Sequence, residues 1–286
     1  MREIHIAIAS TTSLPAALDH NLGQITGFAR RAAETGCALL LTPEMSASGY
    51  GGYPEVIATA EPAGCGPIHE RLAAAATETG VVVCAGFVEA MEEKRFISHY
   101  AVWPGGRFIV QRKHRATPRE RPLQPFLPLL PEADPAEPGQ PETVAMEPFE
   151  VGGVRCAIFI CADHGLAQRK ALLAGHGVDL MLLPVGAGGL REDRVCTEEL
   201  ATAAGRDRYY SLLQRVFFPG ESVLECLENG RAIAAVNLTG HDGRDHYHIG
   251  HGSIINRWGE VPGFFHGIPN LDRQRPMFAH ARLDFA

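Results

Sequence analysis

Three features are missing from the sequence, and each absence excludes a class of protein. No apolar stretch approaches the roughly 18 residues that a membrane-spanning helix needs, so we expect no membrane segment. No run of lysine and arginine is long enough to follow a phosphate backbone, and the formal net charge is −7, so we expect no nucleic-acid partner. The first residues, MREIHIAIAS, are typical of a strand rather than of a signal peptide, and we expect a cytoplasmic protein.

The cysteines and histidines show no familiar metal or disulfide spacing. The seven cysteines are scattered and form no C-x-x-C pair, which argues against a disulfide framework and a structural zinc site. Cys37, Cys84 and Cys156 lie in or beside apolar runs, so we expect them to be packing residues. The alternating histidines within 241–251 stand in a stretch rich in Gly and Asp, and we interpret them as a solvated surface rather than as metal ligands.

What the sequence does contain is an alternation of strand patterns and helix patterns. Hydrophobic residues make up 45% of the chain and charged residues 21%, ordinary values that provide for a core. No linker divides the chain, so the pattern predicts one α/β domain whose mixed central sheet is covered by helices. The predicted strands are 4–10, 37–42, 81–87, 178–184, 231–237 and 276–284. The predicted hairpins lie within 99–111, 143–161 and 251–261. The predicted helices are 15–35, 67–79, one from 165 onward, and 194–230.

The stretch 154–165, VRCAIFICADHG, contains a candidate nucleophile. An apolar strand pattern stops at Cys161, and a helical pattern follows, which predicts that this thiol lies on the turn from a strand into a helix. Ligands of open α/β folds gather at such turns, and a helix N-terminus lowers the pKa of a thiol. The alternative for a single cysteine of this kind is a small packing residue.

Two other polar residues, Glu44 and Lys113, also follow directly after strand patterns. Because strand ends on one edge of a sheet converge, the two side chains and Cys161 are expected to meet. A carboxylate can take the thiol proton, the thiolate can attack a carbonyl carbon, and an ammonium can stabilise the oxyanion. The backbone N–H of Ala162 would be a second oxyanion donor.

Six motifs follow one another along the chain: LTPE with GY behind it (41–50), QRKH (111–114), ICAD (160–163), VDLMLLP (178–184), EN with a later N (228–237), and GxS with a later WGE (252–260). In this order and spacing the chain resembles, over almost its whole length, the nitrilase or carbon–nitrogen hydrolase superfamily, in its amidase or N-carbamoyl amidohydrolase-like branch. The resemblance implies a catalytic triad of Glu44, Lys113 and Cys161. It also implies a four-layer-forming αββα sandwich, with residues 1–286 as a single domain.

The resemblance implies no cofactor and no metal, and it implies a homodimer or a higher homo-oligomer. The helix after Cys161 and the C-terminal tail, about 270–286, are the candidates for the subunit interface. The family also carries a second catalytic glutamate between its lysine and its cysteine, often a set distance before a Pro-Gly. Glu132 precedes Pro138-Gly139 in this way and is the preferred candidate. Glu120, which is nearer to Lys113 in sequence, is the alternative.

The expected reaction is hydrolysis of a nonpeptide carbon–nitrogen bond through a thioester, with a small amide or an N-carbamoyl compound as substrate. True nitrilases often have Trp after the nucleophile, so Ala162 favours amides over nitriles. Nitrile hydrolysis, acyl transfer to an amine and a catalytically silent binding protein are the alternatives. Tyr50, Ala162, Asp163 and His164 are the candidate substrate-binding residues, with Asp163 expected to orient the turn after the nucleophile. A carboxylate-bearing substrate would need an arginine, for which the candidates are Arg169, Arg191 and Arg194.

Overall fold

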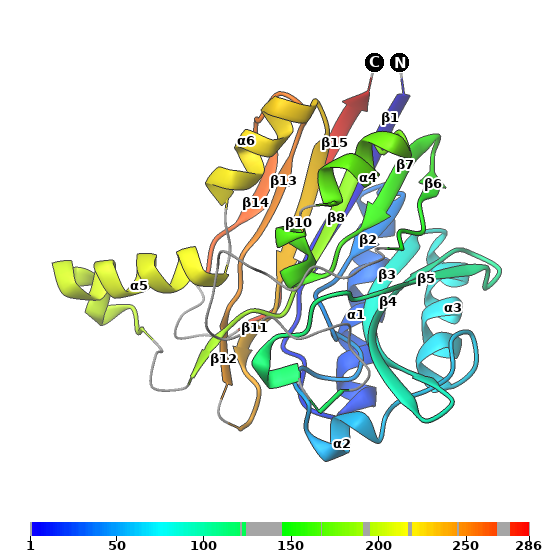
Figure 1. The fold of residues 1–286 in the computed structure, drawn as a ribbon, viewed down its shortest axis with the longest axis horizontal. Helices are drawn as coiled ribbons and strands as arrows, with labels where there is room; N and C mark the ends of the chain where they lie inside the picture. The colour runs from blue at the N-terminus through cyan, green and yellow to red at the C-terminus, as the bar shows by residue number, and fades with distance from the viewer. Residues whose placement is uncertain are drawn as a thin grey trace.

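The chain forms two six-stranded sheets that pack face to face, with helices on the outer faces (Figure 1). This is seen in a computed structural model, which describes residues 2–120, 122–123, 145–166, 168–190, 195–216, 219–244, 246–267 and 275–285. The strand orders are β15-β1-β2-β3-β4-β5 in the first sheet and β14-β13-β10-β8-β7-β6 in the second. The αββα sandwich is confirmed. The single central sheet predicted from the residue pattern alone is wrong, because strands buried on both faces look alike whichever sheet they join.

The strands of the first sheet are β1 (Arg2–Ser10), β2 (Leu39–Leu41), β3 (Val82–Met91), β4 (Lys94–Val102), β5 (Phe108–Arg112) and β15 (Met277–Phe285). Those of the second are β6 (Phe149–Val151), β7 (Val154–Ile158), β8 (Leu180–Val185), β10 (Ala232–Asn237), β13 (Gly252–Ile255) and β14 (Gly263–Phe265). The helices are α1 (Leu18–Glu34), α2 (Pro54–Ile57), α3 (Pro67–Thr79), α4 (Arg169–Gly175), α5 (Ala203–Val216) and α6 (Pro219–Asn229). None of the helices in these described ranges is long and apolar enough to cross a membrane.

Alternation along β1 shows how the layers are specified. Ile4, Ile6 and Ile8 belong to the core between the two sheets, while Ala7 and Ala9 belong to the core under the helices α1 and α3. Large β-branched side chains thus fill the space between the sheets, and small ones allow the helices to approach the sheet closely. The C-terminal strand β15 pairs antiparallel with β1 along its whole length, so the two ends of the chain lie side by side (Figure 1).

The predicted helix 67–79 matches α3, which has Pro67 in its first turn and ends at Gly80, whose φ of 73° suits glycine. The predicted helix 194–230 is instead divided into a short 3-10 turn, α5 and α6. The predicted hairpins are present as β4–β5, β6–β7 and β13–β14.

A third, three-stranded sheet was not predicted. It consists of β9 (Gly189–Leu190), β11 (Thr239–His241) and β12 (His246–Ile249). His246 and His248 are buried in β12, and His251 is buried just beyond it. The interpretation of these histidines as a solvated surface is therefore wrong. Their rings pack edge-on against Tyr50, with centroid distances of 5.8 Å for His246 and 5.3 Å for His248, and this packing removes them from solvent.

Candidate active site

Three strand ends bring a carboxylate, an ammonium and a thiol together, as the sequence predicts. Glu44 follows β2, Lys113 follows β5 in the same sheet, and Cys161 follows β7 in the facing sheet. Lys113 Nζ donates to Glu44 Oε1 at 2.7 Å, and both side chains are fully buried. The Cys161 thiol and the Glu44 carboxyl are close enough that each influences the pKa of the other. The site thus lies where the ends of strands from both sheets meet.

A second glutamate, Glu120, holds the lysine from another side. Lys113 Nζ lies 2.8 Å from Glu120 Oε1 and 2.7 Å from Oε2. The same carboxylate accepts the Tyr50 hydroxyl at 2.8 Å and the backbone N–H of Thr117 at 2.8 Å. Glu132, the preferred sequence candidate for this place, lies outside the described residues. The signal that favours Glu120 in the sequence is its position, seven residues after the lysine.

The buried charges of this cluster shift one another's titration. Burial raises the pKa of Glu44 to about 7. The positive charge of Lys113 opposes this rise, and the negative charge of Glu120 adds to it. Burial alone would lower the pKa of Lys113, but Glu120, Glu44 and Cys161 together hold that pKa well above its ordinary value. Lys113 therefore stays cationic, whereas Glu44 can gain and lose a proton near neutral pH.

Cys161 occupies a strained turn. Its φ is 49°, a left-handed conformation that is unusual for a residue other than glycine, and it opens the 3-10 turn Cys161–Gly165. The α-helix α4 begins only at Arg169, so the expectation that a helix N-terminus lowers the pKa of this thiol is wrong. Burial and the neighbouring charge of Glu44 instead raise the pKa of Cys161, so that the resting thiol carries its proton.

Asp163 connects the turn of the nucleophile to the strand end of the lysine. Its fully buried carboxylate accepts the backbone N–H of His114 at 3.0 and 3.1 Å and that of Arg115 at 2.9 Å. The His114 ring lies 3.3 Å away from the same group, and its Nε2 accepts the backbone N–H of Ala145 at 3.1 Å. Both oxygens of Asp163 are thus occupied by the segment directly after Lys113, which supports its expected orienting role.

Comparison with protein-family models matches residues 5–204, more than half of the chain, to the family described as carbon-nitrogen hydrolase. The chain belongs to the carbon-nitrogen hydrolase family. It is therefore an enzyme of that class.

Solved structures give the same fold at low sequence identity. An amidase from Nesterenkonia sp. is 21% identical, with a TM-score of 0.71, over 99% of this chain and 90% of that one. A mutant of the amidase from Nesterenkonia sp. AN1 in complex with butyramide is 21% identical, with a TM-score of 0.72, over 99% and 91% of the two chains. Another mutant of that amidase carries the acetamide moiety of fluoroacetamide on its active-site cysteine, and it matches at 21% identity and a TM-score of 0.73 over 99% and 90%. Comparison with curated protein sequences finds no significant match.

In this hydrolase, backbone packs closely against the triad. A Cβ on Gly186, directly after β8, would lie 2.8 Å from Glu44 Oε2 and 2.4 Å from the Tyr50 ring, so only glycine fits there. The neighbouring Ala187 carbonyl lies 3.2 Å from His248 Nδ1. The loop after β8 therefore lies between the Glu44 carboxylate and His248 of the third sheet. Tyr50, a predicted substrate-binding residue, is placed directly beside the triad.

The other two candidate substrate-binding residues lie on the same turn as the nucleophile. Ala162 is partly exposed next to Cys161. The pKa of His164 is lowered to about 3 by burial and by the charges of Arg169 and Lys170. Arg169 and Lys170 both belong to α4.

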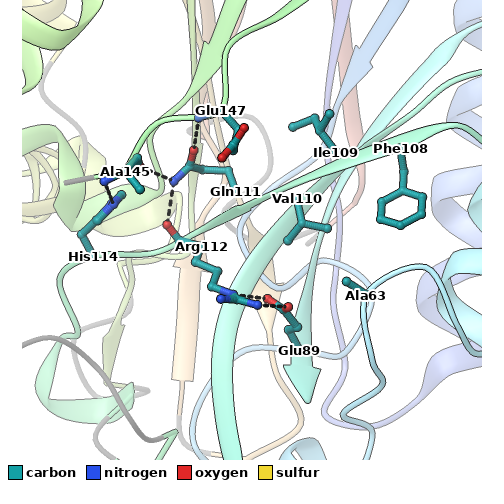
Figure 2. A pocket seen from close by; sticks show the side chains of 10 residues that line it. All are labelled: Ala63, Glu89, Phe108, Ile109, Val110, Gln111, Arg112, His114, Ala145 and Glu147. Carbon is teal, nitrogen blue, oxygen red and sulfur yellow. Dashed lines mark hydrogen bonds and ion pairs between the residues drawn. The ribbon is translucent and has the colours of Figure 1, made fainter. Parts of the chain in front are cut away.

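A hollow of about 410 Å³ lies beside the site, between β5 and the segment 145–147 (Figure 2). Arg112 and Glu89 face it as an ion pair of 2.5 Å, and Gln111 donates to the Ala145 carbonyl at 3.1 Å. His114 also lines it, but Glu44, Lys113 and Cys161 do not. The hollow is thus adjacent to the strand that carries the lysine and separate from the reacting groups.

Proposed function

We propose that this hydrolase is an amidase that cleaves small amides through a thioester on Cys161. The observation that carries the proposal is the buried contact of Lys113 with Glu44 and Glu120, beside the thiol. A general base near neutral pKa, a permanent cation and a thiol in one buried cluster are the three groups that acyl transfer from an amide needs.

The steps follow from the positions of the groups. Glu44 takes the proton of the Cys161 thiol as the sulfur attacks the carbonyl carbon of the amide, and a C–S bond forms. The oxyanion is stabilised by Lys113 and by the backbone N–H of Ala162. The C–N bond then breaks, ammonia or an amine leaves with the proton returned from Glu44, and Glu44 next deprotonates a water that hydrolyses the thioester. Glu120 positions the Lys113 ammonium, whose Nζ donates to Glu120 Oε2 at 2.7 Å.

Two observations favour small neutral amides as the substrate class. One structural neighbour is a complex with butyramide, and another carries the acetamide moiety of fluoroacetamide on its active-site cysteine. Arg169, the described candidate for recognition of a substrate carboxylate, is buried and paired with Glu225 at 2.5 Å. Arg191 and Arg194 lie outside the described residues. An N-carbamoyl amino acid is therefore less favoured than an uncharged aliphatic amide.

The test is ammonia release from acetamide, propionamide, butyramide, butyronitrile and an N-carbamoyl amino acid, with intact-mass spectrometry in parallel. The wild type and a Cys196→Ala control are expected to release ammonia from the amides and to show an acyl adduct. Cys161→Ala is expected to do neither. Equal turnover by Cys161→Ala would refute the thioester mechanism. Turnover confined to the nitrile, product formation only with an added amine, or binding without turnover would each establish one of the alternative functions.

A further inference from the structure

A cluster of three potential metal ligands lies away from the triad, on the helix-covered face of the first sheet. It consists of His5 on β1, Cys37 in the connection from α1 to β2, and His280 on β15. One ligand atom from each side chain lies within 4.8 Å of the other two. Cys37 is 5% exposed, His5 is partly buried and His280 is exposed, so the cluster is closed on the protein side and open to solvent on the other.

The pairing of the two end strands and the turn after α1 create this cluster. Strand β15 runs antiparallel to β1 with His280 opposite Ala7, which places His280 diagonally next to His5 on the same face. The backbone N–H of Ala38 donates to the His5 carbonyl at 2.7 Å, and this bond fixes the residue after Cys37 beside β1. All three ligands are therefore held by backbone hydrogen bonds of the fold.

The polar atoms of the cluster have few other partners. His5 Nε2 and His280 Nδ1 are 2.9 Å apart, while His5 Nδ1 is buried with no hydrogen-bond partner. The Cys37 sulfur lies 3.4 Å from the Thr35 hydroxyl. Arg282 is the nearby cation, and its charge is balanced by Glu3 at 2.7 Å. Imidazole and thiolate ligands without competing strong partners are the set that Zn²⁺ prefers.

We propose that His5, Cys37 and His280 form a binding site for Zn²⁺ or a similar divalent transition-metal ion, with water as the fourth ligand on the exposed side. A tetrahedral zinc ion holds its ligand atoms roughly 3.3–3.8 Å apart, since Zn–N and Zn–S bonds are about 2.0–2.1 and 2.3 Å long. The ligand atoms now lie within 4.8 Å of one another, so binding requires the two imidazoles and the thiol to rotate toward the ion. Binding displaces the thiol proton of Cys37 to solvent.

The bound ion would join three segments that are far apart in the sequence: the first strand, the end of the first helix and the last strand. It would therefore act as a structural clamp on the outer layer and would take no part in the reaction at Cys161. Because the ion binds the folded chain, saturation with Zn²⁺ is expected to raise the melting temperature, by about 5 °C at a hundredfold excess over Kd.

The test uses the full chain with Cys161→Ala, so that the catalytic thiol cannot bind the probe. Co²⁺ is titrated as a spectroscopic substitute for Zn²⁺, and calorimetry with Zn²⁺ gives the stoichiometry. One equivalent with a thiolate-to-cobalt absorption band and tetrahedral ligand-field bands is expected. Adding Cys37→Ser should abolish the band, and adding His280→Ala should weaken binding at least tenfold.

Two matched variants serve as controls. Cys65→Ser and His176→Ala remove an exposed thiol and an exposed imidazole elsewhere, and they should leave metal binding unchanged. Because His280 is exposed, His280→Ala is expected to fold, so it tests the site even if Cys37→Ser does not fold. Absence of a thiolate band, or binding that survives His280→Ala undiminished, would overturn the proposal.

Discussion

At the scale of single residues, the titration of Glu44 controls the expected pH dependence. Its pKa is raised to about 7 by burial, and as the general base it must be ionised. Protonation below this value removes the base, so kcat/KM is expected to fall about tenfold per pH unit below pH 7 and to reach a plateau above it. A rate profile from pH 5 to 9 measures this. An unchanged kcat/KM down to pH 5 would contradict the role of Glu44.

Glu120 and Glu132 can be distinguished by a pair of matched substitutions. Glu120→Gln removes one of the two negative charges that hold Lys113, and we expect kcat to fall about 100-fold or more. Glu132→Gln is the control and is expected to leave kcat within about twofold. Circular dichroism of both variants tests for folding. The reverse result would show that the Pro-Gly spacing, and not the proximity to Lys113, identifies the second glutamate.

The sequence predicts the residues of this site better than it predicts their environment. Glu44, Lys113 and Cys161 stand after strand patterns and within recognisable motifs, so their meeting was predictable. Glu120 was second choice, because the choice depends on where a lysine Nζ points after an irregular segment. The raised pKa of Cys161 was also not predictable, since it comes from burial of the thiol and from the neighbouring charge of Glu44, which depend on tertiary packing.

At the scale of elements, the turn Cys161–Gly165 and the end of β5 are joined through Asp163. Asp163→Asn replaces one acceptor oxygen by an NH₂ group that faces backbone N–H donors. We expect a loss of stability of about 2–4 kcal/mol and a fall in kcat of at least tenfold, with KM affected less. Denaturant unfolding and steady-state kinetics measure the two effects. A variant with wild-type kcat would show that Asp163 does not position the nucleophile.

The contact of β3 with the loop of Glu44 depends on Gly86. A Cβ at this position would lie 2.2 Å from the backbone nitrogen of Met45 and 3.0 Å from the carbonyl carbon of Glu44. Gly86→Ala is therefore expected to displace Glu44 and to lower kcat/KM by at least tenfold. Gly27→Ala in α1 is the control, because its added methyl meets nothing within 4 Å and should stabilise the helix by about 0.5–1 kcal/mol. Full activity of Gly86→Ala would refute this account of the loop.

At the scale of the whole molecule, the order of strands and helices was largely predictable, but their division into layers was not. Apolar runs and apolar alternation locate β1, β10 and β15 well, because burial leaves the same pattern in any sheet. Which strands pair across long separations, as β15 does with β1, is determined by tertiary packing. The strands of the third sheet were missed for a related reason. His246 and His248 are polar in sequence, and their burial comes from tertiary contacts such as those with Tyr50 and Ala187.

Self-association is the remaining expectation at this scale, and the exposed side chains suggest where to test it. The apolar patch consists of Leu224, Leu227, Trp258, Val261 and Phe264, which are all more than 40% exposed. Leu224 and Leu227 lie on α6, and Leu227 packs over Gly259 in the β13–β14 turn, so the helix and the hairpin form one surface (Figure 1). Contiguous exposed apolar side chains of this kind mark interaction surfaces.

We therefore expect the wild type to sediment as a dimer or a larger homo-oligomer and Leu227→Asp to sediment as a smaller species, because a charge in an apolar interface must be desolvated without a partner. Ala171→Asp on α4 tests the interface predicted from the sequence, and Met91→Asp, at another exposed site, is the control. Sedimentation velocity measures all four proteins. Dissociation by Ala171→Asp alone would assign the interface to α4, and a monomeric wild type would refute self-association. Retained activity in a dissociated Leu227→Asp variant would further show that one subunit contains the complete site.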